Sequence, residues 1–171
     1  MILPAVRDPR MVTVRRGGSL TDADHHLLAL WAAECADHVL WLFETAVPED
    51  PRPRDALAAV RGWVAAEVPM MRSRAAGGHA MGAARPLTGA PRFAAYAVGQ
   101  AACVPHVAEH DLGAAAYAIK AVVAAAAPTE AERARVEECA WQRDRLPDAV
   151  RELVLEDQRR RNALCWSVFT P

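Results

Sequence analysis

Two histidines, a tyrosine and the single lysine of the chain lie close together in an alanine-rich stretch, PHVAEHDLGAAAYAIKA. Most residues of this stretch are typical of a buried helix, so the polar side chains among them need an explanation. They follow one another at intervals of four and three residues, with a glycine in the row: His106, His110, Gly113, Tyr117 and Lys120. On an α-helix this spacing predicts that they share one face.

These residue types could perform acid/base chemistry on a small molecule. Histidine titrates near neutral pH, so we expect His106 or His110 to act as a catalytic acid or base. Tyr117 or Lys120 would orient or polarise the bound group, and a Lys120 of lowered pKa could form a Schiff base. Gly113 would leave room beside the row for a ligand or for a neighbouring helix.

A second polar row lies on the helix predicted from SLTDADHHLLALWAAECADHVLWLFE. Its apolar residues recur with helical periodicity, and their stripe includes Trp31, a candidate wall of a binding site that is more often simply core. Asp24, Glu34 and His38 fall inside this stripe on a helical wheel. Buried carboxylates need partners, so we expect these three groups to face inward.

The two rows together favour a polar cavity between two helices. In this interpretation His38 is a further catalytic acid or base, and Asp24 and Glu34 bind the ligand. His25 and His26 point away from the apolar stripe on the wheel and are not included. Trp41 flanks the stripe and is expected to be partly exposed.

Two other interpretations of the rows remain open. The polar groups could form a satisfied hydrogen-bond network that sets how the helices pack. They could also hold a metal ion, because histidines four residues apart on a helix can share one, with Glu34 or His38 completing the set around His106 and His110. The motif HxxxH without the glutamate of HExxH is a weak signal, so we assign no metal or cofactor.

Helical periodicity and proline positions predict an all-α fold, a single bundle of about seven antiparallel helices. We expect an irregular N-terminal arm over residues 1–20 and a helical domain over residues 21–171. Thr21 and Asp24 form a capping-box candidate for the first helix, and Asp50 is the expected N-cap of a second that ends near Val68.

The remaining helices are delimited by further signals of the same kind. We expect a third helix over residues 70–84, a fourth helix that Pro105 kinks or ends, and a fifth helix over residues 109–126. Thr129 and Glu132 suggest a capping box for the sixth helix, while Pro147 opens a seventh that extends as far as Cys165.

The composition excludes several classes of function. The chain has 20 basic and 21 acidic residues, so it lacks the positive charge that binding to nucleic acid requires. No apolar run approaches the length that spans a membrane, and we expect no membrane partner. Four widely spaced cysteines show no metal-binding pattern and are expected as small buried residues of a cytoplasmic protein.

The order of several segments resembles the Imm-5-like family of bacterial immunity proteins. These segments are DHHLLALWAAECADHVLWLFE, DPRPRDALAAVRGWV, HVAEHDLGAAAYAIKA and RLPDAVRELVLEDQRRRNALCWSVF. The resemblance extends over nearly the whole chain from Asp8 onward, implies a small all-helical protein, and brings no catalytic residues with it. The family pattern has a histidine at the position of Gln100 and an alanine at that of Pro105.

Two functional hypotheses follow from the sequence. The resemblance implies a cytoplasmic protein whose outer surface captures and neutralises a toxin domain. The two polar rows favour a small-molecule enzyme or binder with an internal pocket, for instance in a biosynthetic cluster. The oligomeric state is not predicted by either.

Overall fold

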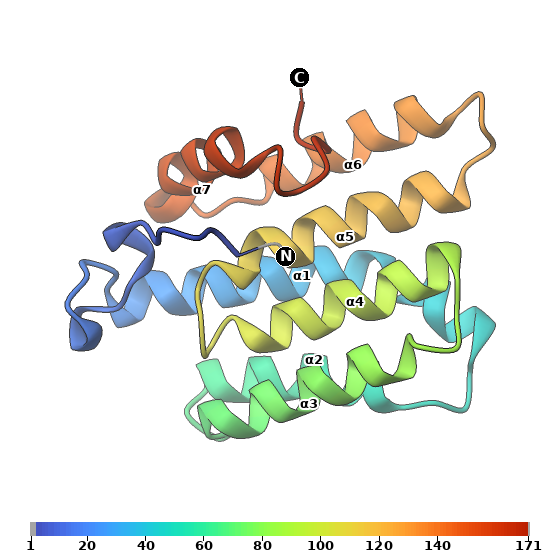
Figure 1. The fold of residues 1–171 in the computed structure, drawn as a ribbon. Helices are drawn as coiled ribbons and strands as arrows, with labels where there is room; N and C mark the ends of the chain where they lie inside the picture. The colour runs from blue at the N-terminus through green and yellow to red at the C-terminus, as the bar shows by residue number, and fades with distance from the viewer. Residues whose placement is uncertain (1–2, 171) are drawn as a thin grey trace.

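Seven α-helices and no β-strand make up residues 3–170, the part of the chain that the computed structural model describes (Figure 1). The all-α prediction is therefore confirmed, while the outer ends of the predicted arm and domain, residues 1, 2 and 171, lie outside the described residues. The helices are α1 (Asp22–Ala46), α2 (Arg52–Val64), α3 (Met70–Ala83), α4 (Gly89–Cys103), α5 (His110–Ala125), α6 (Ala131–Asp144) and α7 (Asp148–Arg161). Two short 3-10 helices precede them, η1 (Pro9–Met11) and η2 (Val14–Arg16).

The long helix α1 lies at the centre of the bundle and packs against α2, α4 and α5. In Figure 1, α6 and α7 lie above α1, α4 and α5, and α2 and α3 lie below them. Alanine-rich surfaces allow α4 and α5 to pack closely. At the α3–α4 contact the approach is closer still, since a Cβ on Gly77 would lie 2.7 Å from the carbonyl oxygen of Gly99.

The predicted start of α1 is confirmed in atomic detail. The Thr21 hydroxyl accepts a hydrogen bond from the Asp24 backbone N–H at 3.1 Å and donates one to the Asp24 carboxylate at 2.8 Å. Asp50 is not the N-cap of α2 as predicted, because the helix begins one residue later, at Arg52, with Pro51 as its N-cap. The Asp50 carboxylate still accepts the backbone N–H of Arg52 at 3.1 Å. Side chains thus satisfy N–H groups that the first turn leaves without intrahelical partners.

Three further predicted helix boundaries are wrong. Helix α2 ends at Val64, before the predicted Val68, because Ala66 adopts a left-handed conformation with φ of 60° and the chain turns back. Helix α7 ends at Arg161 and does not reach Cys165. No Thr129 cap forms at α6, because the Glu132 carboxylate binds Arg135 at 2.6 Å.

Apolar side chains and all four cysteines fill the interior of the bundle. The N-terminal arm contributes to the same core, since Met11 and Leu20 are buried. Within residues 3–170 no helix combines the length and apolar character that crossing a membrane requires.

A buried arginine joins the last helix to α5. Arg161 is 1% exposed, and its guanidinium donates to the Asp157 carboxylate within α7. It also lies 3.3 Å from the Asp111 carboxylate and donates to the Glu109 carbonyl oxygen at 2.9 Å. Since a buried charge is stable only when it is paired and hydrogen-bonded, these contacts determine how α7 sits on the start of α5.

The same polar cluster holds the N-terminal arm. Arg7 donates two hydrogen bonds to the buried Glu109 carboxylate, at 2.8 and 2.6 Å. Asp8 accepts hydrogen bonds from Arg10 at 2.9 Å and from Arg160 of α7 at 2.6 Å. Arg10, and to a smaller extent Arg160, hold the pKa of Asp8 at about 2, well below its usual range. The arm is therefore attached to both α5 and α7 through ion pairs.

We expect Arg161→Met to lower the free energy of unfolding by about 3 kcal/mol or more, because it leaves two buried carboxylates without their shared cation. Arg159→Met is the matched control, since Arg159 is exposed on the same helix, and its effect should stay within about 0.5 kcal/mol. Urea denaturation measures both. Adding Asp111→Asn to Arg161→Met should recover part of the loss, and equal effects of the two arginine variants would contradict the assigned role.

Candidate functional site

The predicted row on α5 exists in part. Gly113, Tyr117 and Lys120 lie on the helix, which begins at His110. Their neighbours are residues of α4 and, for Tyr117 and Lys120, also Trp166 near the C-terminus. His106 does not share the helix, because α4 ends at Cys103 and the chain turns through Pro105 before α5 starts. The prediction that Pro105 ends or kinks the fourth helix is confirmed.

His110 is engaged in packing between α4 and α5. Its Nδ1 lies 2.7 Å from Oε1 of Gln100, an oxygen that only accepts, so His110 donates this hydrogen bond. Gly113 makes room for the same amide, since a Cβ there would lie 2.4 Å from Oε1. Burial lowers the pKa of His110 to about 4. His110 is therefore a neutral side chain that is hydrogen-bonded to a neighbouring helix, as expected if the polar groups form a structural hydrogen-bond network.

Tyr117 and Lys120 lie in an aromatic pocket at the other end of the row. The Lys120 amine sits 4.7 Å from the ring centre of Phe93 and 4.0 Å from that of Trp166, where the π faces stabilise its charge. The ring of Tyr117 lies 5.2 Å from that of Tyr96. Burial lowers the pKa of Lys120 and raises that of Tyr117. This open pocket has a volume of about 410 Å³.

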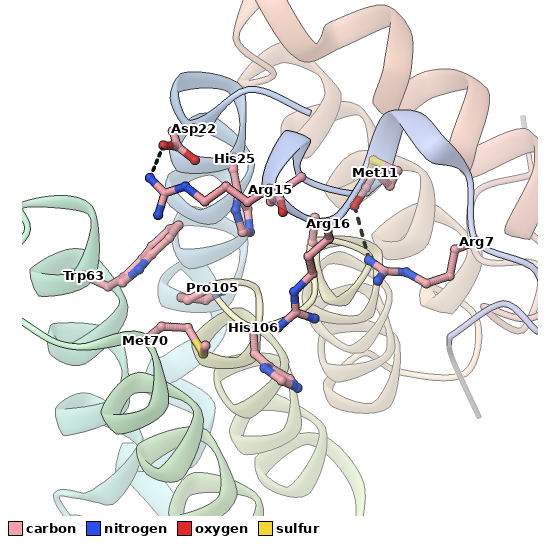
Figure 2. A pocket seen from close by; sticks show the side chains of 12 residues that line it. Arg7, Met11, Arg15, Arg16, Asp22, His25, Trp63, Met70, Pro105 and His106 are labelled. Atoms are coloured by element: carbon pink, nitrogen blue, oxygen red, sulfur yellow. Dashed lines mark hydrogen bonds and ion pairs between the residues drawn. The ribbon is translucent and has the colours of Figure 1, made fainter. Parts of the chain in front are cut away.

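His106 belongs to a separate pocket between the N-terminal arm and the α4–α5 turn, shown in Figure 2. Its Nδ1 is buried without a hydrogen-bond partner within residues 3–170. Burial and the nearby charges of Arg74, Arg16 and Arg7 lower its pKa. His106 is thus a neutral imidazole next to several cations.

The second row does not face the interior, so its predicted orientation is wrong. Asp24 is half-buried at the end of α1, in the cap with Thr21. The Glu34 side chain is 50% exposed and pairs with Arg145 at 3.1 Å. His38 is also exposed, and its Nδ1 lies 2.9 Å from a carboxylate oxygen of Glu138.

The error on α1 has a physical cause. Because α1 is central, buried residues surround most of its circumference, and the wheel defined no single inward direction. His25, expected to point outward, is instead buried and hydrogen-bonded through Nε2 to the Val104 carbonyl oxygen at 2.8 Å. Trp31 is core, and its indole N–H donates to the Gln142 carbonyl oxygen at 2.9 Å.

The two rows therefore do not meet around one cavity. The pocket of His106, the pocket of Lys120 and the surface around His38 share no lining residue. The four ligands considered for a metal ion are also apart: His106 lines the first pocket, His110 packs against Gln100, and Glu34 and His38 lie at the surface. No group of three metal-ligating side chains occurs among residues 3–170. The catalytic and binding roles assigned from the sequence remain predictions, now at separate positions.

An exposed surface formed by α1 and α6 emerges in place of the predicted cavity. The ring of His38 stacks on that of Trp141 at 3.6 Å, and the Arg145 guanidinium lies 3.8 Å from the centre of the same ring. Trp41, one turn further along α1, is 59% exposed, as expected. We call this surface the α1–α6 face. It comprises Leu30, Glu34, Asp37, His38 and Trp41 of α1, Glu137, the buried Glu138 and Trp141 of α6, and Arg145 directly after α6.

Sequence reasoning missed the N-terminal arm as a source of site residues. Arg7, Arg15 and Arg16 from the arm line the pocket of His106 together with Trp63 of α2. The pair Arg15–Arg16 next to two glycines was the available signal. Nearly all basic residues of the chain are arginine, so an arginine pair is expected from the composition alone and did not stand out.

We expect His110 to make stability fall in mild acid. Its pKa is about 4 in the fold and 6.5 when unperturbed, so between these values the unfolded chain takes up a proton that the folded protein excludes. Stability should drop by roughly 2 kcal/mol from about pH 7 to about pH 4.5 through this group. The test compares urea denaturation of the protein and of His110→Gln, which keeps a donor for Gln100. If the difference in free energy of unfolding between the two proteins is the same at both pH values, the assignment to His110 is refuted.

Comparison with known proteins identifies the family of the chain. The model of the family described as "Imm-5 like putative immunity protein" matches residues 18–149, which cover α1 through α6 and the beginning of α7. No curated protein and no solved structure matches the chain significantly. Since the match covers well over half of the sequence, the chain belongs to the Imm-5-like family of immunity proteins.

Proposed function

We propose that this protein is a cytoplasmic immunity protein that binds and neutralises a toxin domain through the α1–α6 face. Membership of the Imm-5-like family supports an immunity function in general. We choose this surface because Trp41 is exposed there and because the ring of Trp141 stacks on that of His38 on the same side of the molecule.

The α1–α6 face has the composition of a binding surface. Tryptophan is enriched among residues that dominate interface energies, because its large ring buries much apolar area at little cost in conformational entropy. The ring of Trp141 is held by the His38 stack and the Arg145 contact. A side chain ordered in this way loses little further freedom when a partner binds.

The carboxylates of this face have partners within the protein. Two shallow hollows flank the His38–Trp141 stack, and one of them, about 430 Å³, opens between α1 and α6. Among their lining residues are four carboxylates and no arginine or lysine: Glu34, Asp37, Glu137 and Glu138. Arginines beside the hollows pair with three of these carboxylates: Arg145 with Glu34, Arg61 with Asp37 and Arg133 with Glu137. The fourth, Glu138, is buried and bonded to His38. These carboxylates therefore hold the face together and do not define the charge of the partner.

The small-molecule hypothesis depended on one internal cavity shared by the two rows. The structure separates those rows, and no observation at the His38 surface favours catalysis. Toxin capture therefore remains the better-supported function.

We expect Trp41→Ala to weaken binding to the cognate toxin domain by about 30-fold, the loss typical of a central aromatic anchor. Isothermal titration with toxin domains encoded near the gene, together with rescue of growth on co-expression, provides the measurement. Met71→Ala is the matched control, because Met71 is also an exposed apolar residue but lies on α3, away from this face.

The two parts of the proposal fail in different ways. If a toxin is neutralised equally by the protein and by Trp41→Ala, the α1–α6 face is the wrong surface while the immunity function stands. If no candidate toxin is bound or neutralised, the proposed function itself is refuted.

A further inference from the structure

A concave pocket lies between the N-terminal arm, the start of α1, the end of α2, the start of α3 and the α4–α5 turn (Figure 2). We call it the arm pocket. It has a volume of about 200 Å³ and shares no lining residue with the hollows of the α1–α6 face. Its walls include Arg7, Arg16, His25, Trp63, Met70 and His106.

Two of the arginines at the arm pocket already have carboxylate partners. Arg7 is bound by the buried carboxylate of Glu109, at 2.8 and 2.6 Å. Arg15 is paired with Asp22 at 2.7 Å, and Figure 2 shows this contact at the rim. These pairs hold their side chains in place and neutralise their charges.

One arginine that lines the arm pocket and another close to His106 add positive charge there. Arg16 lines the pocket and Arg74 lies near His106, and neither forms an ion pair within residues 3–170. Figure 2 shows the Arg16 side chain extending from the arm toward His106. His106 has a buried Nδ1 without a hydrogen-bond partner in the same range, and an unsatisfied buried nitrogen costs free energy. A bound anion would offset this positive charge.

The opposite wall of the arm pocket is apolar. It is formed by Trp63, Met70 and Pro105. Trp63 is fixed by edge-on contacts with the rings of His25 and His26, with centroids 5.0 and 4.7 Å away. A ligand that fits both walls therefore carries an anionic group and a compact apolar or aromatic group.

We propose that the arm pocket binds a small organic phosphate, with the phosphoryl group near Arg16 and His106 and the apolar group against Trp63. Arg16, which has no ion-pair partner among residues 3–170, lines the pocket, and Arg74 adds positive charge near His106. This charge suits a phosphate monoester dianion better than a carboxylate, and arginine binds phosphate oxygens in pairs. The enclosed volume suits a free small molecule. This site is independent of toxin binding and lies on different residues.

Phenyl phosphate is the first probe. Isothermal titration near pH 7.5 should show saturable 1:1 binding, weaker binding of inorganic phosphate, and little binding of benzoate. Arg16→Ala should lower the affinity for phenyl phosphate by tenfold or more. Arg72→Ala is the matched control, because Arg72 is exposed on α3 and does not line the pocket.

A second readout follows His106 directly. Phosphate binding should raise the pKa of His106, measured by side-chain NMR of the histidines, and leave the exposed His79 unchanged. Absence of saturable binding, or equal weakening by Arg16→Ala and Arg72→Ala, would overturn the proposal. Equal affinity for phenyl phosphate and inorganic phosphate would overturn its apolar part. Binding to phosphatidic acid vesicles without binding to phenyl phosphate would show a lipid headgroup as the ligand and overturn the assignment to a free molecule.

Discussion

The buried guanidinium of Arg161 is the constraint on which the arrangement of the other parts depends. A cation in the interior must be surrounded by acceptors, and Asp157, Asp111 and the carbonyl group of Glu109 provide them from two helices. Glu109 in turn binds Arg7, so the same cluster fixes the N-terminal arm. The arm pocket exists because the arm is held there, and its chemistry is thus coupled to the packing of α7.

The polar residues of α5 show how one spacing can serve several purposes. His110 and Gly113 accommodate the Gln100 side chain and so determine how α4 and α5 pack. Lys120, one end of the same row, is held over the aromatic rings of Phe93 and Trp166. His106, the other end, has left the helix and faces the arm pocket. Helical periodicity placed these groups in a line but could not assign them to one site.

Local signals in the sequence were sufficient for the all-α class, the cap at Thr21 and the end of α4 before Pro105, because each depends on interactions within a few residues. Which residues of α1 are buried was decided by the tertiary structure, since helices pack against several sides of α1 and bury most of its circumference. For the same reason Glu34 and His38 lie on the surface while His25 is buried. The burial of Arg161 and the pocket beside the arm also required the fold, because both depend on residues that are far apart in the sequence and meet only when the helices pack.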